Sequence, residues 1–207
     1  MAFSRSKPPA IDDSELLAPG VTARPGDPDR DIIHLVRTGD RRSALHILMR
    51  RHGRMVYRYC REALHDATLA DDVLQQVFIQ AYRDVGTFAG RATVRTWLFA
   101  IARHRVLDAA KSRSRAHAHL EDDDAADTPD PSPPPGERLD DALRLEALVG
   151  CVGVLGEAAR TAVLLHYQQG FSFEEMAVIC GEKPGTLQAR VARALKALRA
   201  CIEARTY

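Results

Sequence analysis

The chain has 207 residues, of which 45% are hydrophobic and 28% charged, and its formal net charge at pH 7 is +1. This length fits one or two domains with real cores, and no apolar run reaches the length of a membrane span. The first twenty residues hold no apolar stretch of signal-peptide length, so we expect a cytoplasmic protein. The cysteines are scattered without a CxxC pair, which favours reduced, mostly buried thiols at Cys60, Cys151, Cys180 and Cys201.

The small net charge hides a strong segregation of charge along the sequence. Residues 31–118 carry a net charge of +8, and residues 119–146 carry −8. A basic block of this kind favours a polyanionic partner. The acidic run could compete with that partner by folding back, or could only keep a linker soluble and extended. Ordinary solvated faces joined by an acidic linker would give the same count.

Apolar spacing predicts a series of helices after an N-terminal arm. Residues 1–26 are rich in Pro, Ser and Asp and lack periodicity, so we expect them to be disordered. The first predicted helix ends at Gly39. Two more helices are expected over residues 40–53 and 54–66, with Gly53 as the stop between them.

The next predicted helix, over residues 68–86, has a wide apolar face. Thr68 is its expected N-cap, and Asp71 and Asp72 follow where the helix dipole favours carboxylates. One apolar row holds Leu69, Val73, Val77 and Ala81, and a second holds Leu74, Phe78 and Tyr82. A surface helix of a small domain needs one such stripe, so the second row is available to a partner.

The segment RTWLFAIARHRVLD (residues 95–108) holds the only tryptophan, Trp97, which lies on an apolar row of helical period. Thr93 is the expected cap of this helix. The remaining surface carries three arginines, Arg95, Arg103 and Arg105. From Arg115 the pattern dissolves into an acidic, Pro-rich linker of roughly 20 residues, which could span about 60 Å if extended.

A second helical unit follows the linker. Helices are expected around residues 139–149 and 163–167, and SFEE (residues 172–175) is a capping box. GEKPG (residues 181–185) reads as a tight turn before a basic amphipathic helix that begins at Thr186. A short helix, a Gly-containing turn and a basic helix predict a helix-turn-helix, with a plain helical hairpin as the alternative.

No enzymatic or metal-binding pattern stands out, so we expect no catalytic residue, no metal and no cofactor. His46, His52, Cys60 and His65 lie close in sequence, but their helical positions do not converge on one face. The carboxylates at 122–124 lie in a flexible segment, where coordination geometry is hard to hold. Walker, dinucleotide and hydrolase motifs are absent from the sequence.

Two stretches, residues 56–108 and 159–199, resemble the conserved domains of the extracytoplasmic-function (ECF) sigma factors, small subunits of bacterial RNA polymerase. The blocks ADDV…QQVF, TWLFAIAR and GTLQARVARA occur in the order that this family shows. The resemblance implies an all-α protein with two small domains. Its expected parts are a disordered arm (1–28), a sigma region 2-like helical bundle (29–116), a flexible acidic linker (117–136) and a region 4-like helix-turn-helix domain (137–207).

The resemblance also implies a role for individual residues. Contact with the core polymerase is expected at Asp72, Gln75, Gln76, Phe78, Ile79 and Tyr82, unless this helix serves only the core of its own domain. Binding of the −10 promoter element is expected at Phe88, Gly90, Arg91, Arg95, Trp97, Arg103, His104 and Arg105, with Trp97 equally open to a core role. Binding of the −35 element is expected at Lys183, Thr186, Gln188, Ala189, Arg190, Arg193 and Lys196.

The sequence departs from the family at several of these positions. His104 stands where the family usually has Asn, and Gln188 and Ala189 replace a basic residue and Ser, so base readout cannot simply be transferred. Gln188 could instead pair with adenine.

The implied partners are core RNA polymerase, through the clamp helices of its largest subunit and the flap of the second largest, promoter DNA and an anti-sigma factor. The rival hypotheses are a stand-alone helix-turn-helix regulator and a nucleic-acid enzyme with a helix-turn-helix arm.

Overall fold

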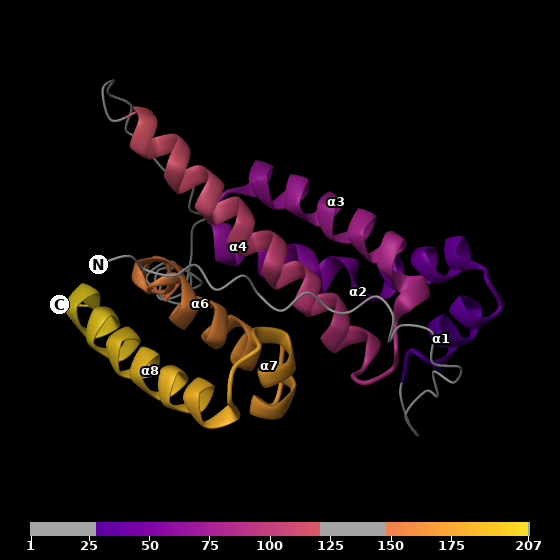
Figure 1. The fold of residues 1–207 in the computed structure, drawn as a ribbon. Coiled ribbons are helices and arrows are strands. Elements are labelled where there is room, and N and C mark those ends of the chain that lie inside the picture. The colour runs from indigo at the N-terminus through magenta and orange to yellow at the C-terminus, as the bar shows by residue number, and fades with distance from the viewer. Residues whose placement is uncertain (1–27, 121–147, 207) are drawn as a thin grey trace, which may run out of the picture.

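The computed structural model describes residues 28–120 and 148–206, and within these ranges the chain consists of helices and loops without a strand (Figure 1). The expected all-α fold is confirmed. The N-terminal arm, the charges of residues 121–146 and the helix start near Leu139 lie outside the described residues. No helix in the two described ranges is both long and apolar enough to span a membrane.

Two domains are visible in the described chain. The first, residues 28–120, contains α1 (Arg30–Arg37), α2 (Arg41–Leu64), α3 (Ala67–Asp84), the short η2 (Val85–Thr87) and α4 (Val94–Leu120). The second, residues 148–206, contains a helical stretch at 148–154, then α6 (Glu157–Val163), η3 (Leu164–Gln168), α7 (Phe173–Cys180) and α8 (Pro184–Thr206). The long helix α4 and the helix α2 of the first domain both contact the second domain (Figure 1).

The predicted break at Gly53 is wrong, because α2 is one continuous helix of 24 residues. A glycine inside a helix costs about 1 kcal/mol relative to alanine, which packing against neighbouring helices can outweigh. Here a Cβ atom at Gly53 would lie 4.0 Å from the ring of Phe78 on α3. The glycine therefore lies inside α2, where it lines the groove between α2 and α3 and does not end the helix.

Side-chain caps mark the starts of several helices. The Asp66 carboxylate accepts a hydrogen bond of 2.9 Å from the Leu69 amide and caps α3, so Thr68, the predicted cap, lies inside the helix. The Thr93 hydroxyl accepts from the Thr96 amide at 3.1 Å, as expected of a cap on α4. The predicted capping box of Ser172 and Glu175 is confirmed at the start of α7.

The helix α4 continues to Leu120, although the apolar pattern was expected to end at Arg115. Residues 116–120 are Ala, His, Ala, His and Leu, and alanine and leucine are strong helix formers. The helix α8 begins at Pro184, two residues before the predicted start. Proline suits the first turn of a helix because its missing N–H would be unpaired there.

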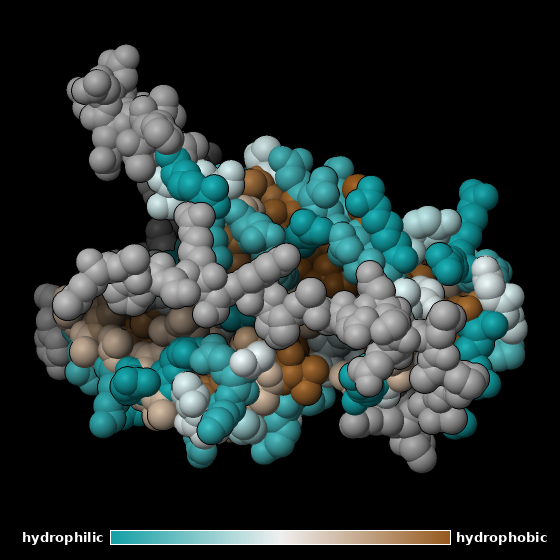
Figure 2. Space-filling model, in the orientation of Figure 1, coloured by the Kyte–Doolittle hydropathy of each residue, from teal (hydrophilic) through white to brown (hydrophobic). Residues whose placement is uncertain are grey.

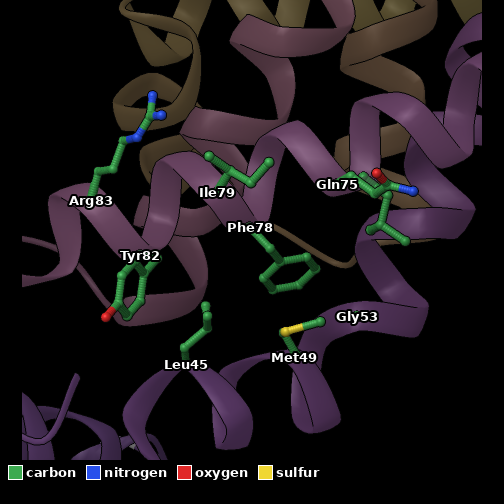
Figure 3. A pocket seen from close by; sticks show the side chains of 9 residues that line it. Leu45, Met49, Gly53, Gln75, Phe78, Ile79, Tyr82 and Arg83 are labelled. Atoms are coloured by element: carbon green, nitrogen blue, oxygen red, sulfur yellow. The ribbon is translucent and has the colours of Figure 1, made fainter. Parts of the chain in front are cut away.

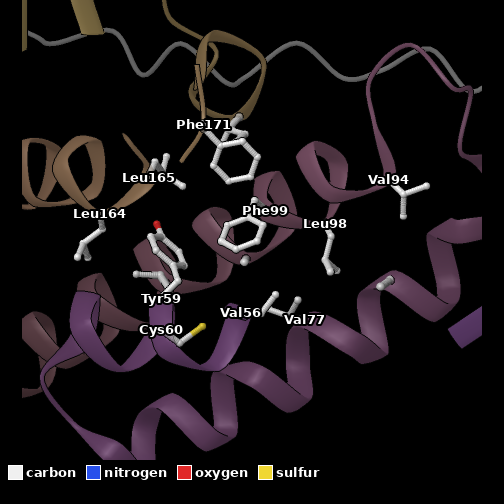
Figure 4. Packing of buried hydrophobic residues seen from close by; sticks show 14 of the residues in the cluster. Val56, Tyr59, Cys60, Val77, Val94, Leu98, Phe99, Leu164, Leu165 and Phe171 are labelled. Carbon is white, nitrogen blue, oxygen red and sulfur yellow. The ribbon is translucent and has the colours of Figure 1, made fainter. Parts of the chain in front are cut away.

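One continuous hydrophobic core joins the two domains (Figure 4). The rings of Tyr59 on α2 and Phe99 on α4 lie 5.7 Å apart, and Phe99 meets Phe171 of the second domain at 5.0 Å, edge to face. All three side chains are buried, together with Leu165. The second domain is thus packed directly onto α2 and α4.

The expectation of reduced thiols is wrong for one pair, because Cys151 and Cys201 form a disulfide with their Cα atoms 5.9 Å apart. It joins the helical stretch at 148–154 to the end of α8. The two cysteines are 50 residues apart in sequence, and only the packing of the second domain brings them together. Cys60 and Cys180 are free thiols, and burial raises the pKa of both, to about 12 for Cys60.

Candidate functional site

An open apolar groove, here called the α2–α3 groove, runs along the outer side of the first domain. It has a volume of about 640 Å³ and is lined by Leu45, Met49, Gly53, Leu74, Gln75, Phe78, Ile79, Tyr82 and Arg83. Phe78 and Tyr82 point from α3 toward Leu45 and Met49 on α2 (Figure 3). Met49, Ile79 and Tyr82 leave 48%, 43% and 45% of their surface exposed, which is unusual for side chains of this size.

The structure brings together only part of the predicted polymerase-binding set. Gln75, Phe78, Ile79 and Tyr82 line the α2–α3 groove, and this accounts for the second apolar row of the helix. Asp72 and Gln76 line a different hollow of about 600 Å³ between α3 and α4. The α2 wall of the groove was not predicted from the sequence, although Leu45 and Met49 are spaced four residues apart on that helix.

Most of the residues that line the hollow between α3 and α4 are polar or charged. Its lining includes Asp66, Asp72, Gln76, Arg105, Asp108 and Arg113. Arg105, predicted to bind the −10 element, donates a 2.6 Å hydrogen bond to the Gln80 side chain on α3. In this arrangement Arg105 therefore braces α4 against α3.

Two of the predicted DNA-binding arginines on α4 face the second domain. Arg95, Phe99 and Arg103 are spaced four residues apart and so share one side of the helix. The Arg95 guanidinium donates to the Gln169 carbonyl and lies 4.0 Å from the centre of the Phe171 ring. Burial lowers the pKa of Arg95, and the side chains of Arg95 and Arg103 are both half-buried. Neither is fully open to a phosphate group here.

The other predicted −10 residues lie around the loop before α4 and on another side of the helix. Phe88 is buried, and its ring packs against Trp97 at 5.4 Å, so Trp97 contributes to packing while staying half-buried. Gly90 has a φ of +67°, which suits glycine in a tight turn. Arg91 and His104 are exposed, with His104 Nδ1 3.1 Å from the Asp108 carboxylate.

The helices α7 and α8 form the predicted helix-turn-helix. Gly181, at a φ of +67°, ends α7, and α8 starts three residues later. Most of the predicted −35 set is exposed: Lys183 in the turn before α8, and Thr186, Gln188, Ala189, Arg193 and Lys196 on α8 itself. Arg190 differs, because its two terminal nitrogens donate to Glu182 at 2.8 and 2.6 Å. This bidentate pair lowers the pKa of Glu182 and ties α8 to the turn.

Models of two sigma-factor families match the chain. Sigma-70 region 2 matches residues 48–116, and Sigma-70 region 4 matches residues 145–198. The ECF RNA polymerase sigma factor SigC of Mycobacterium tuberculosis is 33% identical over 143 residues, which cover 68% of this chain and 74% of that protein. The chain belongs to the ECF family of RNA polymerase sigma factors. It is therefore a transcription initiation factor, and a stand-alone helix-turn-helix regulator is not favoured.

Further comparisons agree with this sigma-factor assignment. The RNA polymerase sigma-H factor of Pseudomonas aeruginosa is 29% identical over 177 residues, 82% of this chain and 91% of that protein. CnrH, solved in complex with the cytosolic domain of CnrY, has a TM-score of 0.63 at 24% identity over 85% of this chain and 97% of that one. RpoE of Bartonella quintana, solved with the anti-sigma factor NepR, has a TM-score of 0.58 at 24% identity over 72% and 90%. The two solved structures support the fold.

A second contact between the domains of this sigma factor lies at the end of α2. Arg160 of α6 donates 2.9 Å to the Ala63 carbonyl, and its other nitrogens donate to carbonyls of its own domain. His65 ends α2 at a φ of +53° and lies against Gly153, where an added Cβ atom would come within 3.3 Å of its ring. Carbonyls at a helix C-terminus attract cations, so Arg160 fastens the second domain to α2.

The unfolding free energy is expected to fall as the pH drops below about 6.5, the usual pKa of histidine. Burial lowers the pKa of His65, Arg160 and Arg113 act in the same direction, and Glu62 opposes them. The unfolded chain therefore binds a proton at His65 at a higher pH than the folded chain does. The stability that neutral His65 contributes is complete above the pKa of the unfolded chain and is lost as the pH falls below it. Urea unfolding of the parent and of His65→Asn, which tolerates the left-handed backbone, tests this. An equal loss of stability in both proteins between about pH 7.5 and 5.5 would contradict it.

Proposed function

We propose that this sigma factor binds core RNA polymerase through the α2–α3 groove. The observation that carries the proposal is the exposed apolar lining of the groove, with Met49, Ile79 and Tyr82 at its surface. Gln75 and Arg83 add polar groups to this lining. An apolar centre with polar groups beside it is what a protein-binding surface requires. The clamp helices of the largest polymerase subunit are the proposed occupant.

The promoter is bound by two separate surfaces in this proposal. The exposed residues at the start of α8, among them Gln188 and Arg193, enter the major groove at the −35 element. The loop before α4, with Arg91, and the arginines of α4 hold the −10 element as its strands separate. Since Arg95 and Arg103 face the second domain, we infer that the two domains move apart when the promoter is engaged.

The protein acts in the cytoplasm, without catalytic chemistry of its own, and an anti-sigma factor is a further proposed partner. In vitro transcription with purified core polymerase on genomic fragments tests the proposal. We expect initiation at defined start sites only when the protein is added. If the protein protects sites on the same fragments without polymerase, and no transcription starts when polymerase is added, the result would instead support a stand-alone regulator.

Readout of the −35 element is expected to depend on Gln188 and Arg193. Replacing either residue by Ala should weaken binding of a promoter found in this way by about 5- to 100-fold, the usual range for a lost base contact. Fluorescence anisotropy with polymerase holoenzyme would measure it. Exposed Glu203, near the other end of α8, offers the control Glu203→Ala. Equal effects of all three substitutions would argue against readout by the start of α8.

A further inference from the structure

A second groove, here called the interdomain groove, lies where the second domain meets α2. It has a volume of about 510 Å³. The second domain supplies its apolar wall, which includes Leu148, Val149, Leu164, Tyr167 and Leu195. Leu148 and Tyr167 are 39% and 58% exposed, and Figure 2 shows hydrophobic residues reaching the surface of the second domain. Side chains of this kind favour an occupant with apolar groups of its own.

The opposite wall of the interdomain groove is charged. Arg58, Arg61 and Glu62 of α2 form it, and Arg58 and Arg61 are exposed. Arg61 donates to Glu62 at 2.8 Å, so Glu62 is already paired and the wall keeps a net positive charge. An occupant that matches both walls must carry apolar side chains and carboxylates within a short stretch.

The described chain begins close to this groove. Arg51 donates to the Pro28 carbonyl at 3.0 Å, and the buried Asp29 accepts from Arg51 and from His52 at 2.9 Å. Burial tends to raise the pKa of Asp29, but these hydrogen bonds outweigh it and hold the pKa below its usual value. The start of the chain is therefore fastened to α2 beside Arg51.

The anchor at Arg51 and the interdomain groove lie on the same side of α2. Arg58 lies seven residues after Arg51, so both occupy one side of the helix, about 10 Å apart along its axis. Met49 and Gly53, which line the α2–α3 groove, lie on another side of α2 from Arg51. Of these two grooves, the interdomain groove therefore lies on the side of α2 where the described chain begins.

We propose that residues 11–17 of this chain, IDDSELL, dock in the interdomain groove. Ile11, Leu16 and Leu17 would face the apolar wall, and Asp12, Asp13 and Glu15 would pair with the arginines of α2. The residues between Leu17 and Pro28 can span up to about 35 Å, more than the distance along α2 requires. The α2–α3 groove is lined from another side of α2 than the one that holds Pro28, so the anchored start of the described chain favours the interdomain groove.

Docking in this place would hold the two domains together, because each supplies one wall of the groove. The segment would therefore act as a strap that keeps Arg95 facing the second domain until a partner displaces it. This proposal concerns the free chain and stands whether or not the α2–α3 groove binds polymerase.

Photo-crosslinking of the full-length protein tests the docking. A benzoylphenylalanine in place of Ser14 leaves the apolar and acidic residues of the segment intact. We expect irradiation to link it, within one chain, to peptides that contain residues 148–168 or 58–62. The double substitution Arg58→Glu and Arg61→Glu should lower the yield about fivefold, as expected for exposed ion pairs. Adding Asp12→Arg and Asp13→Arg to that variant should restore it.

Arg42→Glu is the matched control, because Arg42 is exposed on α2 but does not line the groove. Circular dichroism of each variant verifies that the helices are intact. Equal yields in the Arg58→Glu, Arg61→Glu variant and in Arg42→Glu would overturn the proposal. Links to the α2–α3 groove, or links between two copies of the chain, would overturn it as well by naming another site or another occupant.

Discussion

Met49→Glu and Ile79→Glu, each introduced alone, are expected to lower the affinity for core polymerase at least about 100-fold. Both side chains lie at the surface of the α2–α3 groove, from opposite walls. A carboxylate in the apolar centre of an interface loses its water without gaining a partner, which costs several kcal/mol. Since both residues are nearly half exposed in the free protein, neither change should unfold it. Surface plasmon resonance with immobilised core polymerase would measure the loss.

The matched control for this experiment is Gln76→Ala. Gln76 is exposed on the same helix but lines the polar hollow between α3 and α4. A loss with Gln76→Ala as large as that with Ile79→Glu would place the binding surface on the other side of α3. Phe78→Ala is a poor probe, because the buried Phe78 ring packs near Gly53 and its removal would also destabilise the fold.

Local signals predicted much of the fold. The capping box at Ser172 and the cap at Thr93 depend on neighbours within three residues, and both are present in the structure. The predicted cap Thr68 was wrong, because Asp66, two residues earlier, accepts the hydrogen bond from the Leu69 amide and caps α3. The predicted break at Gly53 was wrong for a different reason, because the buried residues of α2 on both sides of Gly53 stabilise a continuous helix despite the intrinsic cost of glycine.

Features that depend on tertiary packing could not be predicted from the sequence. The second apolar row of α3 indicated a partner surface, but the α2 wall with Leu45 and Met49 required the packing of two helices. The disulfide joins residues whose spacing carries no motif. The arginines of α4 were recognised as a group, yet their division between Gln80 on one side and Gln169 on the other follows from how the domains pack.

Phe171→Ala is expected to separate the two domains of the free protein. The buried Phe171 ring packs edge to face on Phe99 and lies under the guanidinium of Arg95. Removing a buried phenylalanine costs about 3–5 kcal/mol, and here that cost falls largely on the contact between the domains. The Arg95 side chain also loses its cation–π partner. Small-angle X-ray scattering should therefore show a larger radius of gyration for the variant.

The same variant should bind single-stranded DNA more tightly in the absence of polymerase. Separation would free Arg95 and Arg103, and added phosphate contacts should make the binding steeper in salt. Phe173→Ala is the control, because Phe173 stacks on His166 at 4.5 Å within the second domain, so its loss weakens that domain without removing the Phe99 contact. If the two variants show the same radius and the same DNA affinity, the effect is a loss of stability of the second domain. If only Phe171→Ala expands and gains affinity, the aromatic contact between Phe99 and Phe171 is what holds the −10 arginines away from DNA.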